Sequence, residues 1–98
     1  MEHRLKTVKP YFTDVQNGIK LFELRKNDRN FHPGDILILE EFNDTGNAFT
    51  SGYTGQVVRK SVSYVLKDCP QFGLQDGYCV LGIREVYEPD PDRDFEKD

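Results

Sequence analysis

Three charged residues that can bind or transform a ligand stand close together in the first third of the chain: Lys20, Glu23 and Arg25. An ammonium and a guanidinium group donate hydrogen bonds, and a carboxylate accepts hydrogen bonds or a proton. Side chains alternate along a regular strand, so Glu23 and Arg25 share one face and are close enough to pair. Lys20 follows Gly18, where the chain is still turning, and its long side chain can swing toward the same face.

Two interpretations of this group stay open. If the face that Glu23 and Arg25 share lines the mouth of a small barrel, burying one charge alone would be costly, and pairing offsets part of that cost. The alternative is a solvated ion pair on an outer face, which stabilises a protein by less than about 1 kcal/mol. Composition alone does not decide between these interpretations.

Charge is distributed unevenly along the chain. Residues 88–98 hold six acidic and two basic residues, and taking these from the totals of 17 and 13 leaves eleven of each in residues 1–87. The main part of the chain is therefore neutral and has no general attraction for nucleic acid, so a nucleic-acid site must be a local patch. The best candidate is the segment 20–29, which holds four basic and two acidic residues.

A binding site in this segment would divide its work between cations and other side chains. We expect phosphate contacts from the four basic residues, Lys20, Arg25, Lys26 and Arg29. Asn27 can read a base edge, and Tyr53, at the end of a polar loop, can stack on an unpaired base. For Tyr53 the alternative is an aromatic side chain that anchors the loop or fills the core.

Hydrophobic spacing predicts the elements that position these residues. We expect a short strand over 4–8, and then a helix that begins near Pro10, with Tyr11, Phe12 and Val15 at helical spacing. Gly18 can take the left-handed conformation that ends a helix. Further strands are predicted over 20–26, 35–42, 56–66 and 77–88, with an exposed polar loop over 43–52 and a compact connection over 69–74.

Several predicted strands are apolar on both faces, as in Ile36–Leu39 and Val80–Leu81. An open sheet with one wet face would waste this pattern, whereas a closed barrel hides both sets and removes exposed edges. We therefore predict an α+β fold: a small mixed β-barrel of about five to six strands with one main helix near the N-terminus. In the strand over 56–66, alternation places Val58, Val62, Tyr64 and Leu66 on one face and Val57 and Val65 on the other.

The length and composition also bound the class of protein. We expect one domain over residues 1–87, followed by a solvated and mobile acidic tail over 88–98. No apolar run is long enough to cross a membrane, no secretory signal is visible, and the use of two cysteines favours a reduced, cytoplasmic protein. Cys79, in an apolar strand, is expected to be an inert thiol. We expect no metal or other cofactor, and a monomer or weak homodimer.

The segment 18–25 resembles the G-x-K-x-x-E-x-R signature of ASCH domains, which belong to the PUA-like superfamily. Other parts of the chain are similar to the same family, in an order that covers about residues 3–87. They are His3-x-Leu5-Lys6, Tyr11-Phe12, Arg25–Arg29, Gly34-Asp35-x-Leu37, Tyr53-Thr54-Gly55 and Gly77-Tyr78-x-Val80-Leu81. Together they resemble a single-domain bacterial and phage branch of unknown function.

The resemblance implies a small β-barrel with a cleft beside the signature that binds RNA or nucleotides. It also implies an alternative, because some ASCH proteins hydrolyse N4-acylated cytidine nucleosides and others are ribonucleases. The amidohydrolases use the signature Lys with a Thr three residues later and a Glu elsewhere. Here Lys20 matches the Lys, but Glu23 occupies the position of the Thr. Lys20 and Glu23 are therefore the acid–base candidates of a hydrolase, while the simpler expectation is a binding protein without catalysis.

Overall fold

The computed structural model describes residues 1–87, and the predicted acidic tail lies outside the described residues. Its elements follow the order β1 (Glu2–Val8), α1 (Lys9–Gln16), β2 (Phe22–Lys26), β3 (Ile36–Asn43), β4 (Gly52–Lys67), η1 (Pro70–Phe72) and β5 (Tyr78–Glu85). The predicted order of strands and helix is confirmed. The bounds differ: β2 begins two residues later than predicted, β4 is longer at both ends, and β5 ends at Glu85.

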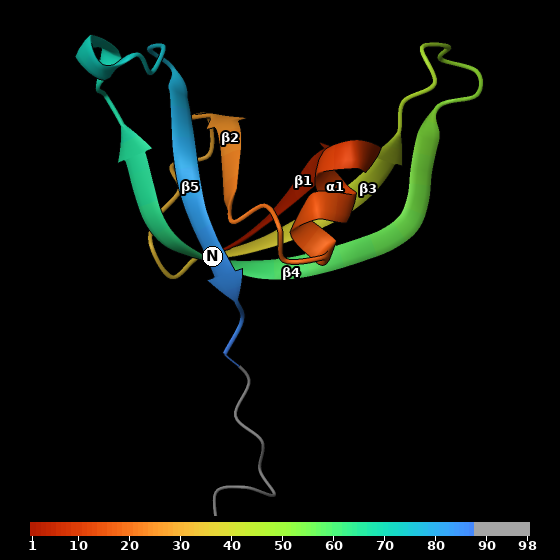
Figure 1. The fold of residues 1–98 in the computed structure, drawn as a ribbon, viewed down its shortest axis with the longest axis horizontal. Coiled ribbons are helices and arrows are strands. Elements are labelled where there is room, and N and C mark those ends of the chain that lie inside the picture. Colours follow the sequence, from red (N-terminus) through yellow and green to blue (C-terminus); the bar gives the residue numbers. More distant parts are fainter. Residues whose placement is uncertain (88–98) are drawn as a thin grey trace, which may run out of the picture.

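The five strands form one mixed sheet that curls into a half-barrel. The strand order is β1-β3-β4-β5-β2, with β1 parallel to β3 and the other pairs antiparallel. In Figure 1, β4 bends from one raised arm of the molecule to the other, and β1, β2 and α1 lie between these arms. The predicted α+β class is confirmed. However, β1 and β2 remain edge strands of the sheet, so backbone hydrogen bonds do not close the barrel.

One apolar core fills the inside of the half-barrel. Phe12 and Val15, on one face of α1, are fully buried together with Leu37 and Leu39 of β3. The remaining core side chains come from β1, β4, β5 and the connection before β3; they are Leu5, Phe31, Val62, Cys79, Leu81 and Ile83. Phe12 and Val15, whose helical spacing indicated the helix, therefore form the face of α1 that packs into the core.

The predicted facing of β4 is wrong beyond Val62. A β-bulge between Val62 and Tyr64 shifts the register with β5, so the alternation of inner and outer side chains changes by one position. As a result Val65 packs against the core, whereas Tyr64 and Leu66 are exposed on the outer face. Gly82 lies at this bulge, where a Cβ atom would come within 2.8 Å of Ser63 Oγ.

The structure bears on two expectations from the sequence: that the cysteines are reduced and that no segment crosses a membrane. Cys69 and Cys79 are both free and buried. Burial raises the pKa of the Cys79 thiol, which disfavours the reactive thiolate, as predicted for an inert core residue. Among residues 1–87, no helix has the length and apolar character that a membrane crossing requires.

Candidate functional site: a cleft between the two edge strands

The end of α1 places Lys20. The backbone N–H of Asn17 donates to Thr13 O, and Gly18, at φ 75°, takes the left-handed conformation predicted for it. The N–H groups of Ile19 and Lys20 then both donate to the carbonyl oxygen of Asp14, at 2.9 and 3.0 Å. The loop is thus held against the last turn of the helix, and Lys20 is fixed just before β2.

Lys20, Glu23 and Arg25 form one cluster, as the sequence predicted. The Lys20 ammonium donates to Glu23 Oε2 at 2.5 Å, and the Arg25 guanidinium donates to Glu23 Oε1 through Nε at 3.0 Å and Nη2 at 2.8 Å. Only 3% of the Glu23 side chain is exposed, against 16% for Lys20 and 21% for Arg25. The solvated outer ion pair is therefore excluded, and Glu23 is a buried carboxylate held by two cations.

Arg25 also joins the two edge strands of the half-barrel. Its Nη1 donates to the backbone oxygen of Lys6 at 2.9 Å, and its Nη2 donates to Thr7 Oγ1 at 2.8 Å. The guanidinium group has five N–H donors, and these bonds together with those to Glu23 occupy four of them. Arg25 therefore bridges β2 to β1 across a seam that the backbone leaves open.

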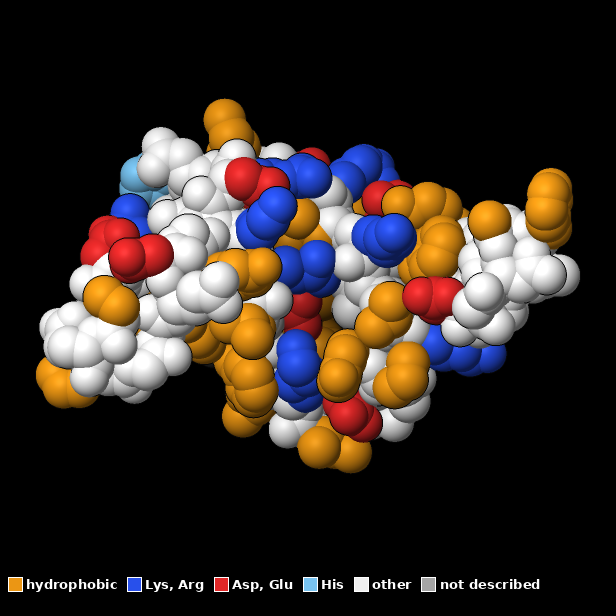
Figure 2. Space-filling model, turned by 90° about the horizontal axis from the view of Figure 1, so that it is seen from above, with side chains coloured by type: hydrophobic (Ala, Val, Ile, Leu, Met, Phe, Trp, Pro, Cys, Tyr) orange, Lys and Arg blue, Asp and Glu red, His pale blue; other side chains and the backbone are white. Residues whose placement is uncertain are grey.

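A cleft of about 390 Å³ lies along this seam. Lys20, Glu23 and Arg25 contribute to its wall, and the other lining residues come from β1, α1 and β2: Lys6, Thr7, Val8, Tyr11, Phe22 and Leu24. Figure 2 looks into this face, where basic side chains surround a central hollow, an acidic side chain lies between them, and hydrophobic side chains flank both sides. The volume lies in the range of small-molecule sites, about 300 to 1,000 Å³.

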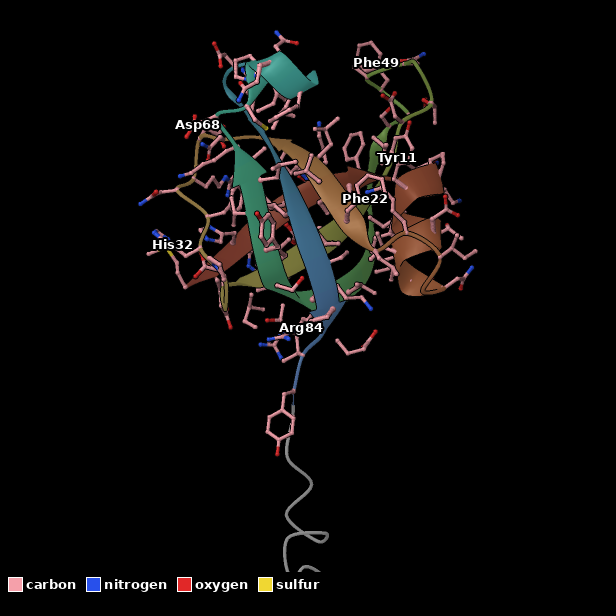
Figure 3. All side chains as sticks on the ribbon, turned by 60° about the vertical axis from the view of Figure 1, so that its left-hand side comes forward. Tyr11, Phe22, His32, Phe49, Asp68 and Arg84 are labelled. Atoms are coloured by element: carbon pink, nitrogen blue, oxygen red, sulfur yellow. The ribbon has the colours of Figure 1, made fainter. Side chains whose placement is uncertain are left out.

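Two aromatic side chains stand beside the Lys20 ammonium. Its Nζ lies 4.9 Å from the ring centroid of Phe22 and 5.7 Å from that of Tyr11. In Figure 3 these two residues face the same region, Tyr11 from α1 and Phe22 from β2. Both rings are about half exposed. A planar ligand can therefore contact aromatic surface and a cation at once.

Lys20 keeps capacity for a further partner. Its ammonium has three N–H donors, of which one bonds to Phe22 O at 2.7 Å and another to Glu23. Within residues 1–87 no hydrogen bond uses the third donor, which can bond to a carbonyl oxygen, ring nitrogen or phosphate oxygen of a ligand. This distinguishes Lys20 from Arg25, whose donors are almost all used inside the protein.

The other predicted site residues are dispersed around the seam. Lys26 and Arg29 line a second cavity, described below, whereas Asn27 is half-buried and donates its backbone N–H to Gly77 O at 2.8 Å. Tyr53 belongs to β4, and its ring packs edge-on against Phe42 with centroids 5.2 Å apart. Asn27 and Tyr53 line neither of the two cavities described here.

Sequence reasoning missed the contribution of β1 and α1 to the cleft. The alternation in residues 4–8 indicates that Lys6 is exposed, but no local pattern shows that β1 faces β2, because these strands lie at opposite ends of the sheet order. Tyr11 was assigned to the apolar side of the helix, yet 56% of it is exposed at the cleft. These contacts arise only when the sheet curls.

Metal chemistry has no built site in the described part of the chain. Within residues 1–87, no three or more His, Cys, Asp or Glu side chains come together in a group that could hold a metal ion.

Comparison with known proteins assigns the family. A family model described as "Domain of unknown function (DUF3850)" matches residues 2–83. The chain belongs to the DUF3850 family. The match spans β1 to β5 and thus includes every residue that lines the cleft. A search of curated proteins finds no match.

Proposed function

We propose that this DUF3850 protein binds RNA or a nucleotide in the cleft between β1 and β2. The observation that carries the proposal is the combination of a buried Glu23, a Lys20 ammonium with a spare donor, and two half-exposed aromatic rings in one cleft. A base offers a planar face for stacking and an edge with both donors and acceptors. The resemblance of residues 18–25 to the ASCH signature supports the same function.

The charges of the cleft fit this ligand better than a general attraction to polyanions. Lys6, Lys20 and Arg25 line it together with a single acid, Glu23. The cleft is therefore positive although the whole chain carries a net charge of −4. A local positive site in an acidic protein favours a short ligand or single strand over the long backbone of a duplex.

Two free, buried cysteines are consistent with a reducing cytoplasmic location, which we also propose.

The test compares Lys20→Met with Arg84→Met. Figure 3 places Arg84 at the end of the molecule away from the cleft, so this control removes one positive charge elsewhere. With fluorescein-labelled RNA octanucleotides (A8, C8 and U8) at low salt, we expect Lys20→Met to weaken binding at least tenfold and the control to change it less than twofold. Thermal unfolding should remain cooperative in both variants. Absence of binding by the unmodified protein, or equal losses in both variants, would contradict the proposal.

A hydrolase is the second candidate, and the contact between Lys20 and Glu23 favours it. These groups share the cleft with the hydroxyl of Thr7. However, both oxygens of Glu23 already accept hydrogen bonds from cations, and Thr7 Oγ1 accepts one from Arg25. If the protein is a hydrolase, incubation with N4-acetylcytidine or RNA will give products that disappear with Lys20→Met. Turnover that survives the substitution would indicate a contaminating enzyme.

A further inference from the structure

A second cavity adjoins the cleft along the seam. It has a volume of about 220 Å³ and lies against β1 and the connection that follows β2. Lys6 and Arg25 line both cavities. Because these two residues belong to both linings, the cavities are neighbours, and we call the cleft and the second cavity together the groove.

The two parts of the groove differ in chemistry. The cleft has two half-exposed aromatic rings, whereas the one aromatic residue that lines the second cavity, Phe31, is only 3% exposed. Four basic residues line the second cavity against one acid, Asp28. The cleft therefore suits a planar group and the second cavity suits an anion.

Two cations of the second cavity, Lys26 and Arg29, have donors to spare. The side chain of Lys26 is exposed and makes no hydrogen bond or ion pair with another of residues 1–87, although its backbone belongs to the β2–β5 ladder. Arg29 donates one Nη1 hydrogen bond to Arg4 O at 3.1 Å, and its Nε is 3.9 Å from Asp28 Oδ1. Nearly half of the Arg29 side chain is exposed. A phosphate oxygen can therefore take bonds from Arg29 and Lys26 without displacing an internal partner of Lys26.

We propose that the groove binds a single strand of nucleic acid at least two nucleotides long, with one base in the cleft and an adjoining phosphate at Lys26 and Arg29. This inference rests on the proposed function and narrows its ligand from any nucleotide to a strand. A free nucleoside would occupy the cleft alone and leave the cations of the second cavity solvated. A strand fills both cavities, whose linings share Lys6 and Arg25.

The test removes the charges of the second cavity and leaves the cleft intact. The variant Lys26→Gln/Arg29→Gln is compared with Lys67→Gln/Arg84→Gln, which removes the same two charges from positions that line neither cavity. The probes are labelled RNA octanucleotides, the DNA octanucleotides of the same sequences, and the free nucleosides. Affinities are measured by anisotropy for the strands and by NMR titration for the nucleosides, and the strand titrations are repeated at several salt concentrations.

We expect the variant of the second cavity to weaken strand binding at least tenfold. The slope of log K against log salt should become shallower by about 0.7 for each phosphate that the variant no longer neutralises. Its affinity for nucleosides should stay within twofold of that of the unmodified protein. The control variant Lys67→Gln/Arg84→Gln should bind every probe with an affinity within twofold of that of the unmodified protein. Tighter binding of the RNA or the DNA series identifies the kind of strand.

Two results would overturn the inference, and they differ from failure of the proposed function. Strand binding that is unchanged in Lys26→Gln/Arg29→Gln but lost in Lys20→Met would place the ligand in the cleft alone. Equal losses in the two double variants would show an effect of net charge and no phosphate subsite. If the unmodified protein binds none of the probes, the proposed function itself fails.

Discussion

Glu23 and Asp35 are two buried carboxylates that are each held by several hydrogen-bond partners, and their surroundings differ. Glu23 lies between Lys20 and Arg25 in the wall of a cleft. Asp35 lies where His3 Nε2 is 2.9 Å from Oδ2 and the N-terminal amine donates to Oδ1 at 3.2 Å. Asp35 also accepts the backbone N–H of His32 at 3.0 Å, and within residues 1–87 it lines neither of the two cavities described above.

The comparison shows that a buried ion pair alone does not mark a site. The contacts of Asp35 tie the N-terminus and β1 to the turn before β3, and Asp35 lines neither cavity. In the Glu23 cluster, one cation bridges two edge strands, and the other lines the cleft with one N–H donor that no hydrogen bond within residues 1–87 uses. The difference is the spare donor and the open space beside it, and the predictions below test it from the largest expected effect to the smallest.

Removing Glu23 should have the largest effect. Glu23→Ala leaves the partly buried Arg25 and Lys20 without a counter-charge, so we expect a loss of about 3 to 5 kcal/mol in the free energy of unfolding, measured by urea titration. The control is Glu40→Ala, which removes an exposed ion pair with Arg4 and should cost less than about 1 kcal/mol. Similar losses in both variants would show that burial of the cluster contributes little.

Arg25→Lys tests the bridge between the edge strands. Lysine keeps the charge next to Glu23 but cannot hold Glu23, Thr7 and Lys6 O at the same time, so we expect a loss of about 2 kcal/mol in unfolding free energy. The matched control, Arg84→Lys, should change stability by less than about 0.5 kcal/mol. Unfolding that is unaffected by Arg25→Lys would mean that the seam does not depend on the guanidinium.

Asp35 should affect stability and its pH dependence, but not binding. Burial alone would raise the pKa of Asp35; hydrogen bonds from His3, the His32 backbone and the N-terminal amine outweigh it and lower the pKa from 3.8 to about 2. A depressed folded-state pKa gives stability that is complete above the unfolded pKa and declines as the pH falls toward 2. Asp35→Asn should therefore cost about 1 to 3 kcal/mol at neutral pH.

The pH profile distinguishes this electrostatic effect from a general defect. The difference in unfolding free energy between the unmodified protein and Asp35→Asn should narrow as the pH falls from about 4 to 2. The affinity of Asp35→Asn for RNA octanucleotides at pH 7 should stay within twofold of that of the unmodified protein. A constant difference across this pH range, or a large loss of RNA binding in a folded variant, would remove the contrast between Asp35 and Glu23.

The smallest effect separates two exposed tyrosines. Tyr11 lines the cleft, whereas Tyr53 packs against Phe42 outside it. Because stacking of a base on an aromatic ring contributes about 1 to 3 kcal/mol, Tyr11→Leu should weaken RNA binding at least fivefold. Tyr53→Leu should change it less than twofold. The opposite ranking would restore the prediction that Tyr53 stacks on a base and would move the ligand toward β4.

Local patterns predicted much of the fold, because the relevant signals are local. Pro10, Gly18 and the spacing of Phe12 and Val15 indicated the helix, and alternation placed Glu23 and Arg25 on one face of β2. The sequence predicted a closed barrel, whereas the structure is a half-barrel with β1 and β2 at its edges. Whether two edge strands pair depends on the curl of the whole sheet, which no local pattern shows. The prediction of which β4 side chains face the core was wrong for a related reason. The bulge at Ser63 depends on the pairing of β4 with β5, which no local pattern shows.

The sequence predicted only one wall of the cleft, the wall that β2 forms. The signature residues indicated the wall on β2, but Lys6, Thr7 and Tyr11 come from elements whose approach to β2 is set by tertiary contacts. The role of Arg25 also could not be predicted. Its type suggests a phosphate contact, while its hydrogen bonds to Lys6 O and Thr7 show that it mainly joins the strands.

The central claim is that the seam between β1 and β2 is where a nucleic-acid ligand binds. A titration of the ¹⁵N-labelled full chain with an unlabelled RNA octanucleotide, followed by ¹H–¹⁵N NMR, tests it most directly. The largest amide shifts should fall in residues 6–11 and 20–29, with little change around Asp35 or in residues 64–67. Shifts centred on the outer face of β4, or a spectrum that does not change at millimolar RNA, would contradict the claim.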